Sequence, residues 1–308
     1  MDAPPRARTP RQLIHWAAQR FEAAGLHFGH GTDNASDEVA WLVGHAMGVA
    51  PEELEQVLDF ELDDAVRDVA LAFIGRRINS RVPAAYLTGE AWFAGLSFHV
   101  DERVIVPRSH LAEPVLERFE PWIDPSRVGR ALDLCTGSGC IAVALALAFP
   151  AARIDATELS AAALEVARRN VAHHAVGDRV RLVQGDLFEG VAGECYDLIV
   201  SNPPYVPDAG LDDFPPEYRA EPRMALAAGA AGLDVVARIL AQAAGQLAPR
   251  GLLAVEVGDT AQALERAYPK VPFTWLATSY GEPGVFVLTR EELDQYREVL
   301  DAGNTATQ

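Results

Sequence analysis

An asparagine followed by two prolines and a tyrosine, Asn202–Tyr205, comes directly after the apolar run YDLIVS. Each proline holds its own φ at about −65° and has no N–H to donate, so these residues can continue neither a helix nor a sheet ladder. The carbonyl oxygens and the side-chain oxygen of Asn202 remain free to accept hydrogen bonds. The pattern indicates rigid acceptors and an aromatic ring at the end of a strand; a turn that holds no ligand is the alternative.

A glycine turn forms a second candidate site. Gly137 and Gly139 lie between the strand-like run ALDLC and the helix-like run IAVALALAF. Glycines at such a turn let a ligand approach the backbone, and the N-terminus of the following helix supplies free N–H groups. Glu158 ends the next strand roughly 20 residues later, a position from which a carboxylate can accept both hydroxyls of a ribose. A surface glutamate that caps the helix starting at Ser160 is the alternative for this residue.

The strand after that ends in QGDLF, where Asp186 can accept a hydrogen bond from an exocyclic amine and Leu187 and Phe188 can lie against a flat ring. A dinucleotide fingerprint would have glycine three residues after Gly139, where this chain has Ala142, a residue that is tolerated there. A dinucleotide therefore stays possible. The glycine turn, the ribose carboxylate and the aspartate together favour S-adenosylmethionine.

Alternating strands and helices position these residues. From residue 128 onward we expect strands at 129–135, 152–158, 179–186, 196–202, 251–257, 273–278 and 284–290, and helices at 141–149, 160–174, 232–247 and 260–268. Strands that alternate with helices at this spacing indicate a mostly parallel sheet covered on both faces. The last two strands are joined by a short loop, so they should pair antiparallel. The tail after Leu300 is expected to be disordered.

The rest of the chain suggests three parts. Residues 1–82 read as a small helical domain for substrate recognition, with a Thr-Pro cap before residue 10 and Ser36 as the N-cap of a second helix. Residues 83–107, rich in aromatic and β-branched residues, predict a β-hairpin connector. Residues 108–308 form the α/β domain.

Composition narrows the classes of function. The 308 residues carry a net charge of −18, which repels duplex phosphate and favours cationic partners, although it can also serve solubility alone. No run is long and apolar enough to span a membrane, and the N-terminus lacks the apolar core of a signal peptide. Three cysteines without a CxxC pair suit a reducing cytoplasm, and no metal site is expected.

The motifs DLCTGSGCIA, Glu158, GDLF and SNPPYV, in this order, resemble the class I methyltransferases of the N-P-P-Y group, the protein-(glutamine) methyltransferases. The resemblance extends over nearly the whole chain and implies a Rossmann-like domain with a seven-stranded sheet whose final strand is antiparallel. It also implies S-adenosylmethionine as methyl donor, without a metal. The residues expected to bind the donor are Asp133, Cys135, Thr136, Gly137, Ser138, Gly139, Glu158, Asp186, Leu187 and Asn202.

The resemblance assigns catalysis and substrate binding to Asn202, Pro203, Pro204 and Tyr205. An amide nitrogen becomes positive as it attacks a methyl group, so acceptors aimed at its hydrogens stabilise the charge where it develops. Asn202 and the Pro203 carbonyl can supply these acceptors, and Tyr205 can pack on the amide. Arg108 in the connector is expected at the substrate entrance, with a structural ion pair as the alternative.

Within the group, the sequence VPRSHLAEPV and the segments PPEYRAEPRMALAAGAAGLD and FTWLAT resemble the branch that modifies large-subunit ribosomal protein three. We therefore expect this basic protein as the partner, met before or during ribosome assembly in the cytoplasm. Methylation of peptide-chain release factors is the alternative. A DNA amino methyltransferase is more remote, because the chain is acidic and has no basic or aromatic DNA-reading segment. A non-enzymatic nucleotide binder would have no use for the rigid acceptors.

Overall fold

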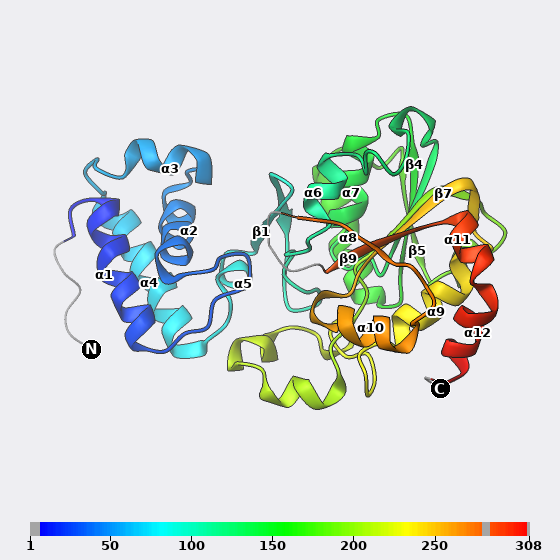
Figure 1. Ribbon diagram of the computed structural model, residues 1–308. Helices are drawn as coiled ribbons and strands as arrows, with labels where there is room; N and C mark the ends of the chain where they lie inside the picture. The colour runs from blue at the N-terminus through cyan, green and yellow to red at the C-terminus, as the bar shows by residue number, and fades with distance from the viewer. Residues whose placement is uncertain (1–6, 279–283, 307–308) are drawn as a thin grey trace.

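The computed structural model describes residues 7–278 and 284–306. Helices α1 to α4 lie on one side of the molecule, a small hairpin follows, and a seven-stranded sheet with its covering helices lies on the other side (Figure 1). Within the described ranges, no helix has both the length and the apolar character needed to cross a membrane.

The first four helices form what we call the helical module: α1 (Pro10–Ala23), α2 (Ala35–Met47), α3 (Pro51–Val57) and α4 (Asp64–Ser80). The Thr9 side chain caps α1, as the Thr-Pro pair predicts. The predicted cap of α2 is wrong: the side chain of Asn34 accepts the N–H of Asp37 at 2.9 Å, and Ser36 lies in the first turn. Asparagine and serine cap helices about equally well, so the pattern alone could not choose between them.

The connector contains a short helix, α5 (Ala84–Thr88), and two antiparallel strands, β1 (Glu90–Phe93) and β2 (Leu96–His99). Ala94 and Gly95, with φ of 51° and 75°, close the hairpin, as two-residue turns with both φ values positive do. The predicted hairpin is therefore present. Helix α6 (Ala112–Leu116) and a short 3-10 turn, η1 (Pro125–Arg127), lead into the sheet.

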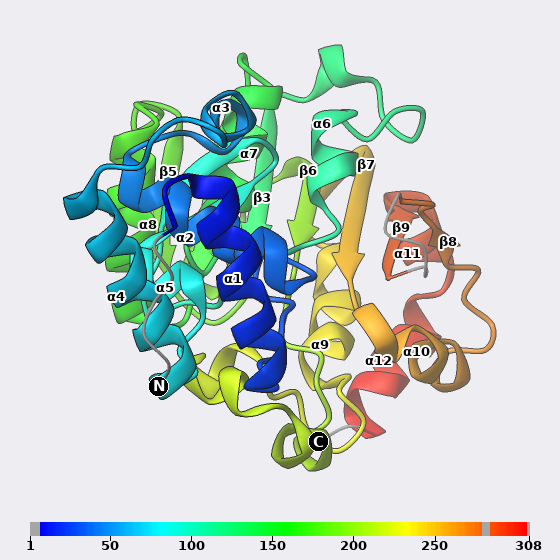
Figure 2. The ribbon, with the colours of Figure 1, turned by 90° about the vertical axis from the view of Figure 1, so that its left-hand side faces the viewer.

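The large sheet consists of β3 (Arg130–Leu134), β4 (Arg153–Glu158), β5 (Val180–Gln184), β6 (Tyr196–Ser201), β7 (Leu247–Glu256), β8 (Thr274–Trp275) and β9 (Val285–Thr289). Its strand order is β5-β4-β3-β6-β7-β9-β8, and β9 runs antiparallel to both of its neighbours (Figure 2). The predicted seven-stranded sheet with an antiparallel final strand is confirmed. The strand expected at 273–278 is shorter, because β8 is an edge strand with two paired residues.

Helices cover both faces of the sheet: α7 (Cys140–Ala148), α8 (Ala161–His173), α9 (Asp234–Ala243), α10 (Ala261–Ala267), α11 (Arg290–Gln295) and α12 (Arg297–Ala306). One apolar core lies between the sheet and α7, and a second lies between the sheet and α9. Disorder was predicted after Leu300, and this prediction is wrong for the residues up to Ala306. Helix α12 continues to Ala306 and packs on α9, and Leu300 is only 1% exposed.

The loop between β6 and α9 contains further short 3-10 turns: η3 (Asp208–Asp213), η4 (Pro216–Ala220) and η5 (Arg223–Ala225). It extends from the sheet toward the helical module and appears in yellow-green at the lower part of Figure 1. This loop is the one that follows the Asn-Pro-Pro-Tyr motif.

Candidate active site

The carboxyl ends of β5, β4, β3 and β6 lie side by side, because these strands are parallel neighbours in the sheet. A cavity of about 170 Å³ lies at this edge, which is where open α/β sheets bind their ligands. We call it the strand-end cavity. Predicted site residues from all of the strand-end motifs line it: Cys135, Gly137, Glu158, Asp186, Leu187, Asn202 and Pro204.

The glycine turn shapes one wall of the strand-end cavity. Gly137 and Gly139 have φ values of 54° and 80°, in the left-handed region that favours glycine. A side chain on Gly139 would lie 3.2 Å from the Cβ of Ala167, so this glycine lets α8 approach the turn. At Gly137 no atom lies within 4 Å of the position that a Cβ would take. The backbone of Gly137 is therefore open to a ligand.

Glu158 at the end of β4 is held in place by the backbone. Its Oε2 accepts the N–H of Gly137 at 2.9 Å, and its Oε1 accepts the N–H of Ser160 at 2.9 Å. The capping alternative is wrong, because the cap of α8 is Ser160, whose hydroxyl accepts the N–H of Ala163 at 3.2 Å. The carboxylate also lines the cavity, and each oxygen has a second lone pair, so it can still accept hydrogen bonds from a ligand.

Asp186, just beyond β5, has a partner that the sequence did not suggest. Its Oδ2 accepts a hydrogen bond from Nη2 of Arg238 at 2.8 Å, and both residues line the cavity. Arg238 lies on α9, where it looks like an ordinary polar residue of an amphipathic helix. Leu187 next to Asp186 is 5% exposed and forms part of the apolar wall.

The Asn-Pro-Pro-Tyr turn leaves β6 at the same edge. The hydroxyl of Ser201 donates to the carbonyl oxygen of Leu134 at 3.0 Å, which joins the ends of β6 and β3. Asn202 and Pro204 line the cavity, whereas Pro203 is buried. Tyr205 also lies off the cavity wall.

Tyr205 instead packs under the end of β7. Its hydroxyl donates to Oε1 of Glu256 at 3.3 Å, and its ring lies against Gly258, where a Cβ would come within 2.8 Å of the ring. Burial raises the pKa of both the tyrosine hydroxyl and the Glu256 carboxyl. The hydroxyl therefore stays protonated and can keep donating to Glu256.

The remaining donor-site predictions, Asp133, Thr136, Ser138 and Gly139, lie behind the cavity wall. Asp133 is fully buried at the end of β3 and accepts a hydrogen bond from the Thr136 hydroxyl. Burial raises the pKa of Asp133 to about 7, although the hydrogen bond from Thr136 opposes this shift. In this structure these residues form or support the turn and do not line the space where a ligand would lie.

Arg108 makes an ion pair, the alternative that the sequence left open. Its Nη2 lies 2.7 Å from Oε2 of Glu221, and its guanidinium lies over the ring of Tyr218, 5.5 Å from the centroid. Arg108 does not line the strand-end cavity. The geometry therefore favours the ion pair over a direct contact between Arg108 and a substrate.

Two further segments complete the cavity wall: Arg103–Ile105 of the connector and, beyond the motif, Pro222, Met224, Ala225 and Ala227. Leu159 and Met224 are apolar residues at this cavity, 56% and 50% exposed. The connector was expected near the entrance. The second segment lies within PPEYRAEPRMALAAGAAGLD, which the sequence marked as a branch feature but not as part of the cavity wall. Wall residues contribute shape instead of a functional group, so a search for reactive residues misses them.

A larger hollow of about 610 Å³ lies between α2 and the hairpin, with Trp41 and Trp92 in its wall. None of the strand-end motif residues lines it. The strand-end cavity is therefore the candidate active site, although it is smaller. The described part of the chain contains no group of three or more histidine, cysteine, aspartate or glutamate side chains that could hold a metal ion.

The sheet order, the antiparallel final strand and the glycine turn beside an acidic strand end define a class I methyltransferase. Two sequence families agree: the methyltransferase small domain matches residues 116–213, and the PrmC N-terminal domain matches residues 12–89. Among solved structures, a methyltransferase from Pyrococcus furiosus is 22% identical with a TM-score of 0.46, over 64% of this chain and 89% of that one.

Curated relatives named ribosomal protein uL3 glutamine methyltransferase are much more similar. The Bordetella pertussis protein is 49% identical over 93% of this chain and 97% of its own length. The Neisseria meningitidis serogroup B protein is 50% identical over 92% and 94%, and the Xanthomonas campestris protein is 47% identical over 91% and 91%. The chain belongs to the family of ribosomal protein uL3 glutamine methyltransferases.

Proposed function

We propose that the protein transfers a methyl group from S-adenosylmethionine to the side-chain amide nitrogen of a glutamine in ribosomal protein uL3. The observation that carries this proposal is the similarity to relatives with that name, at 45–50% identity over more than nine-tenths of the chain. The strand-end cavity supports it, because it combines a nucleoside-type site with the rigid Asn-Pro-Pro acceptors.

The cavity suits the donor. Glu158 can accept the ribose hydroxyls, because its carboxylate lies at the cavity beside the open backbone of Gly137. Asp186, oriented by Arg238, can accept the exocyclic amine of an adenine, and Leu187 provides an apolar surface for the ring. When bound, S-adenosylmethionine supplies an electrophilic methyl group on a sulfonium.

The residues of the turn act on the amide. The oxygen of Asn202, which lines the cavity, accepts a hydrogen bond from one of the amide N–H groups, and this bond strengthens as the nitrogen becomes positive. The resemblance adds the carbonyl of Pro203 as a second acceptor, although Pro203 is buried and does not line the cavity in this structure. The two prolines hold the acceptors still, so little reorganisation is needed during the reaction. The carbon–sulfur bond breaks as the carbon–nitrogen bond forms, so the donor leaves as S-adenosylhomocysteine. The nitrogen then gives up its extra proton to water, and no strong base is required before the methyl arrives, since this proton becomes acidic only afterwards. We assign Tyr205 the role of fixing the turn through Glu256.

Exposed apolar side chains and the charge of the chain suit a protein substrate. Leu159 and Met224 at the strand-end cavity are half exposed, as expected for residues that a docked polypeptide would cover. Ribosomal proteins are basic, so a chain with net charge −18 should attract them by long-range electrostatics. We infer that the substrate is uL3 before it is enclosed in the ribosome, and that the reaction takes place in the cytoplasm.

The proposal is tested by incubating the purified chain with labelled S-adenosylmethionine and one of three substrates: free uL3, assembled large subunits or a release factor. We expect label on free uL3, at one glutamine identified by mass spectrometry. Faster labelling of the release factor would overturn the choice of substrate but not the chemistry. Label on a residue other than glutamine would overturn the chemistry.

A further inference from the structure

The loop that follows the Asn-Pro-Pro-Tyr motif begins and ends at the candidate active site. We call residues 206–227 the strap. At its two ends, the N–H of Val206 donates to the carbonyl of Leu226 at 2.9 Å, and Val206 forms a parallel bridge with Ala227. The first end continues directly from the motif. The second end supplies four residues of the cavity wall: Pro222, Met224, Ala225 and Ala227.

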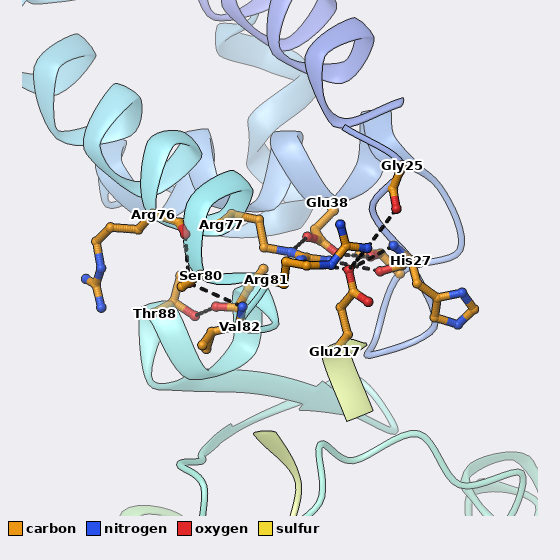
Figure 3. Close-up of polar contacts among 12 residues, drawn as sticks. Gly25, His27, Glu38, Arg76, Arg77, Ser80, Arg81, Val82, Thr88 and Glu217 are labelled. Carbon is orange, nitrogen blue, oxygen red and sulfur yellow. Dashed lines mark hydrogen bonds and ion pairs between the residues drawn. The ribbon is translucent and has the colours of Figure 1, made fainter. Parts of the chain in front are cut away.

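The middle of the strap contacts the helical module and the segment that joins α1 to α2 through the ring of Tyr218, whose centroid lies 4.5 Å from that of His30, and through a buried carboxylate, Glu217 (Figure 3 shows the carboxylate). Glu217 in η4 is 0% exposed, and its Oε1 accepts the backbone N–H of His27 at 3.0 Å. The same oxygen lies 2.8 Å from Nη2 of Arg81 and 3.4 Å from Nη1 of Arg77. Arg77 is itself fully buried and also pairs with Glu38 of α2.

Burial alone would raise the pKa of Glu217, but the N–H of His27 and the charges of Arg81 and Arg77 outweigh it, and its pKa lies below the usual value. Glu217 is therefore ionised at neutral pH. A buried charge must keep its partners, because an unpaired one is strongly unfavourable. The ion pairs thus favour one position of the strap on the helical module.

A second carboxylate holds the strap on its return. Glu221, 5% exposed, accepts the N–H of Val106 at 3.0 Å and pairs with Arg108. The residue after it, Pro222, is the first of the four on the cavity wall. Only a few residues therefore separate Glu217 from this wall. A segment this short cannot move at one end without moving the other.

We propose that Glu217 is a positioning residue for methyl transfer: by docking the strap on Arg77 and Arg81, the helical module sets the far wall of the active site. The module then acts on catalysis in addition to any role in substrate recognition. This inference rests on the proposed function only through methyl transfer and does not depend on which protein is the substrate.

The test uses the full chain carrying Glu217→Gln, which keeps the shape and removes the charge. A misplaced wall should lower turnover by about 10- to 100-fold, since a misplacement of roughly 1 Å far from the chemistry can cost that much. Donor affinity, measured by calorimetry, should fall by a few-fold to about tenfold. Both values are taken per folded molecule, with the folded fraction from circular dichroism.

Matched variants distinguish a role of Glu217 in positioning the cavity wall from a role in stability alone. Arg81→Ala removes one partner of Glu217 and should show the same defect more weakly, whereas Arg81→Lys keeps the charge and should restore most of the turnover. Arg11→Ala, which removes the surface pair with Asp59 inside the helical module, should leave turnover unchanged.

The inference is overturned if Glu217→Gln and Arg81→Ala unfold more readily but keep wild-type turnover and donor affinity per folded molecule. If Glu217→Gln does not fold, the two Arg81 variants decide: equal turnover in Arg81→Ala and the wild type overturns the inference. A wild-type chain that binds no methyl donor would instead contradict the proposed function.

Discussion

The strand-end cavity and the anchors of the strap hold their polar groups in opposite ways. In the cavity, Glu158 is held by Gly137 and Ser160, which lie in its own strand-end turn or the neighbouring one, and it stays partly exposed. At the strap, Glu217 is 0% exposed and its partners Arg77 and His27 are 140 and 190 residues away in the chain. Groups that must meet a ligand are thus presented by short turns at an accessible edge. The wall that encloses them is held by buried, long-range ion pairs.

This comparison predicts that the anchors matter most for stability. Replacing Arg77 by methionine leaves Glu38 buried without its ion-pair partner and takes one of two arginines from Glu217, and removing one member of a buried pair typically costs about 3–5 kcal/mol. Urea unfolding should show a loss of that size. Arg11→Met, at an exposed pair, is the control and should change the free energy of unfolding very little. Equal losses in both variants would remove the distinction between the two kinds of site.

The cavity residues should matter for rate and binding instead. Asn202→Ala should lower turnover by on the order of 10²–10³, because an acceptor that gains its energy in the transition state is lost. Donor affinity and the free energy of unfolding should change little. Single-turnover rates measured at saturating donor check this prediction. Near-wild-type turnover would make the Asn-Pro-Pro turn structural.

Glu158→Ala should weaken donor binding by about 1–3 kcal/mol, since the ribose hydroxyls lose a charged acceptor. Calorimetry measures the change directly. Glu158→Gln keeps an oxygen and is expected to lose less. If the alanine variant bound the donor as tightly as the wild type, the carboxylate would serve only to hold the backbone N–H groups of Gly137 and Ser160.

The two regions should also respond oppositely to pH. Near the strap, burial lowers the pKa of His30 to about 4 against an ordinary value of 6.5, so its contribution to stability is lost as pH falls from 6.5 to 4. Behind the cavity, burial raises the pKa of Asp133 to about 7 from 3.8, so its contribution is lost as pH rises through this range.

Unfolding of His30→Phe and Asp133→Asn between pH 4 and pH 7 tests this contrast. The stability of the wild type relative to His30→Phe should rise with pH, and its stability relative to Asp133→Asn should fall. A difference that does not change with pH in one of the series would show that the group replaced there titrates normally in the folded protein, and would contradict the prediction.

The smallest effect expected is that of salt on substrate association. Raising ionic strength over about 0.05–0.2 M screens long-range attraction between the acidic chain and a basic substrate, so the rate at subsaturating uL3 should fall by a few-fold. Donor affinity should change much less. A rate indifferent to salt would mean that the net charge of −18 serves solubility alone.

Much of this protein could be predicted from local patterns. Alternating runs predicted the sheet and its antiparallel last strand, and the strand-end motifs predicted Gly137, Glu158, Asp186 and Asn202, which meet in one cavity. The reason is that parallel strands bring their carboxyl ends to one edge, so residues at those ends converge wherever they lie in the chain. Errors such as the Ser36 cap came from choices between residues of equal propensity.

The tertiary structure alone decided which polar residues are partners. Arg238 reads as a helix surface residue yet orients Asp186. Nothing in the sequence pairs Glu217 with Arg77, although the two form a buried pair. Such pairs depend on how helices and loops pack across more than a hundred residues, and neither residue carries a local signal of its partner. Sequence therefore determined the chemistry at the strand ends, because backbone periodicity places it. Packing decided how the helical module and the strap enclose the residues at the strand ends. The reason is that a charge removed from water is unfavourable unless it is paired, even when its partner is distant in the chain.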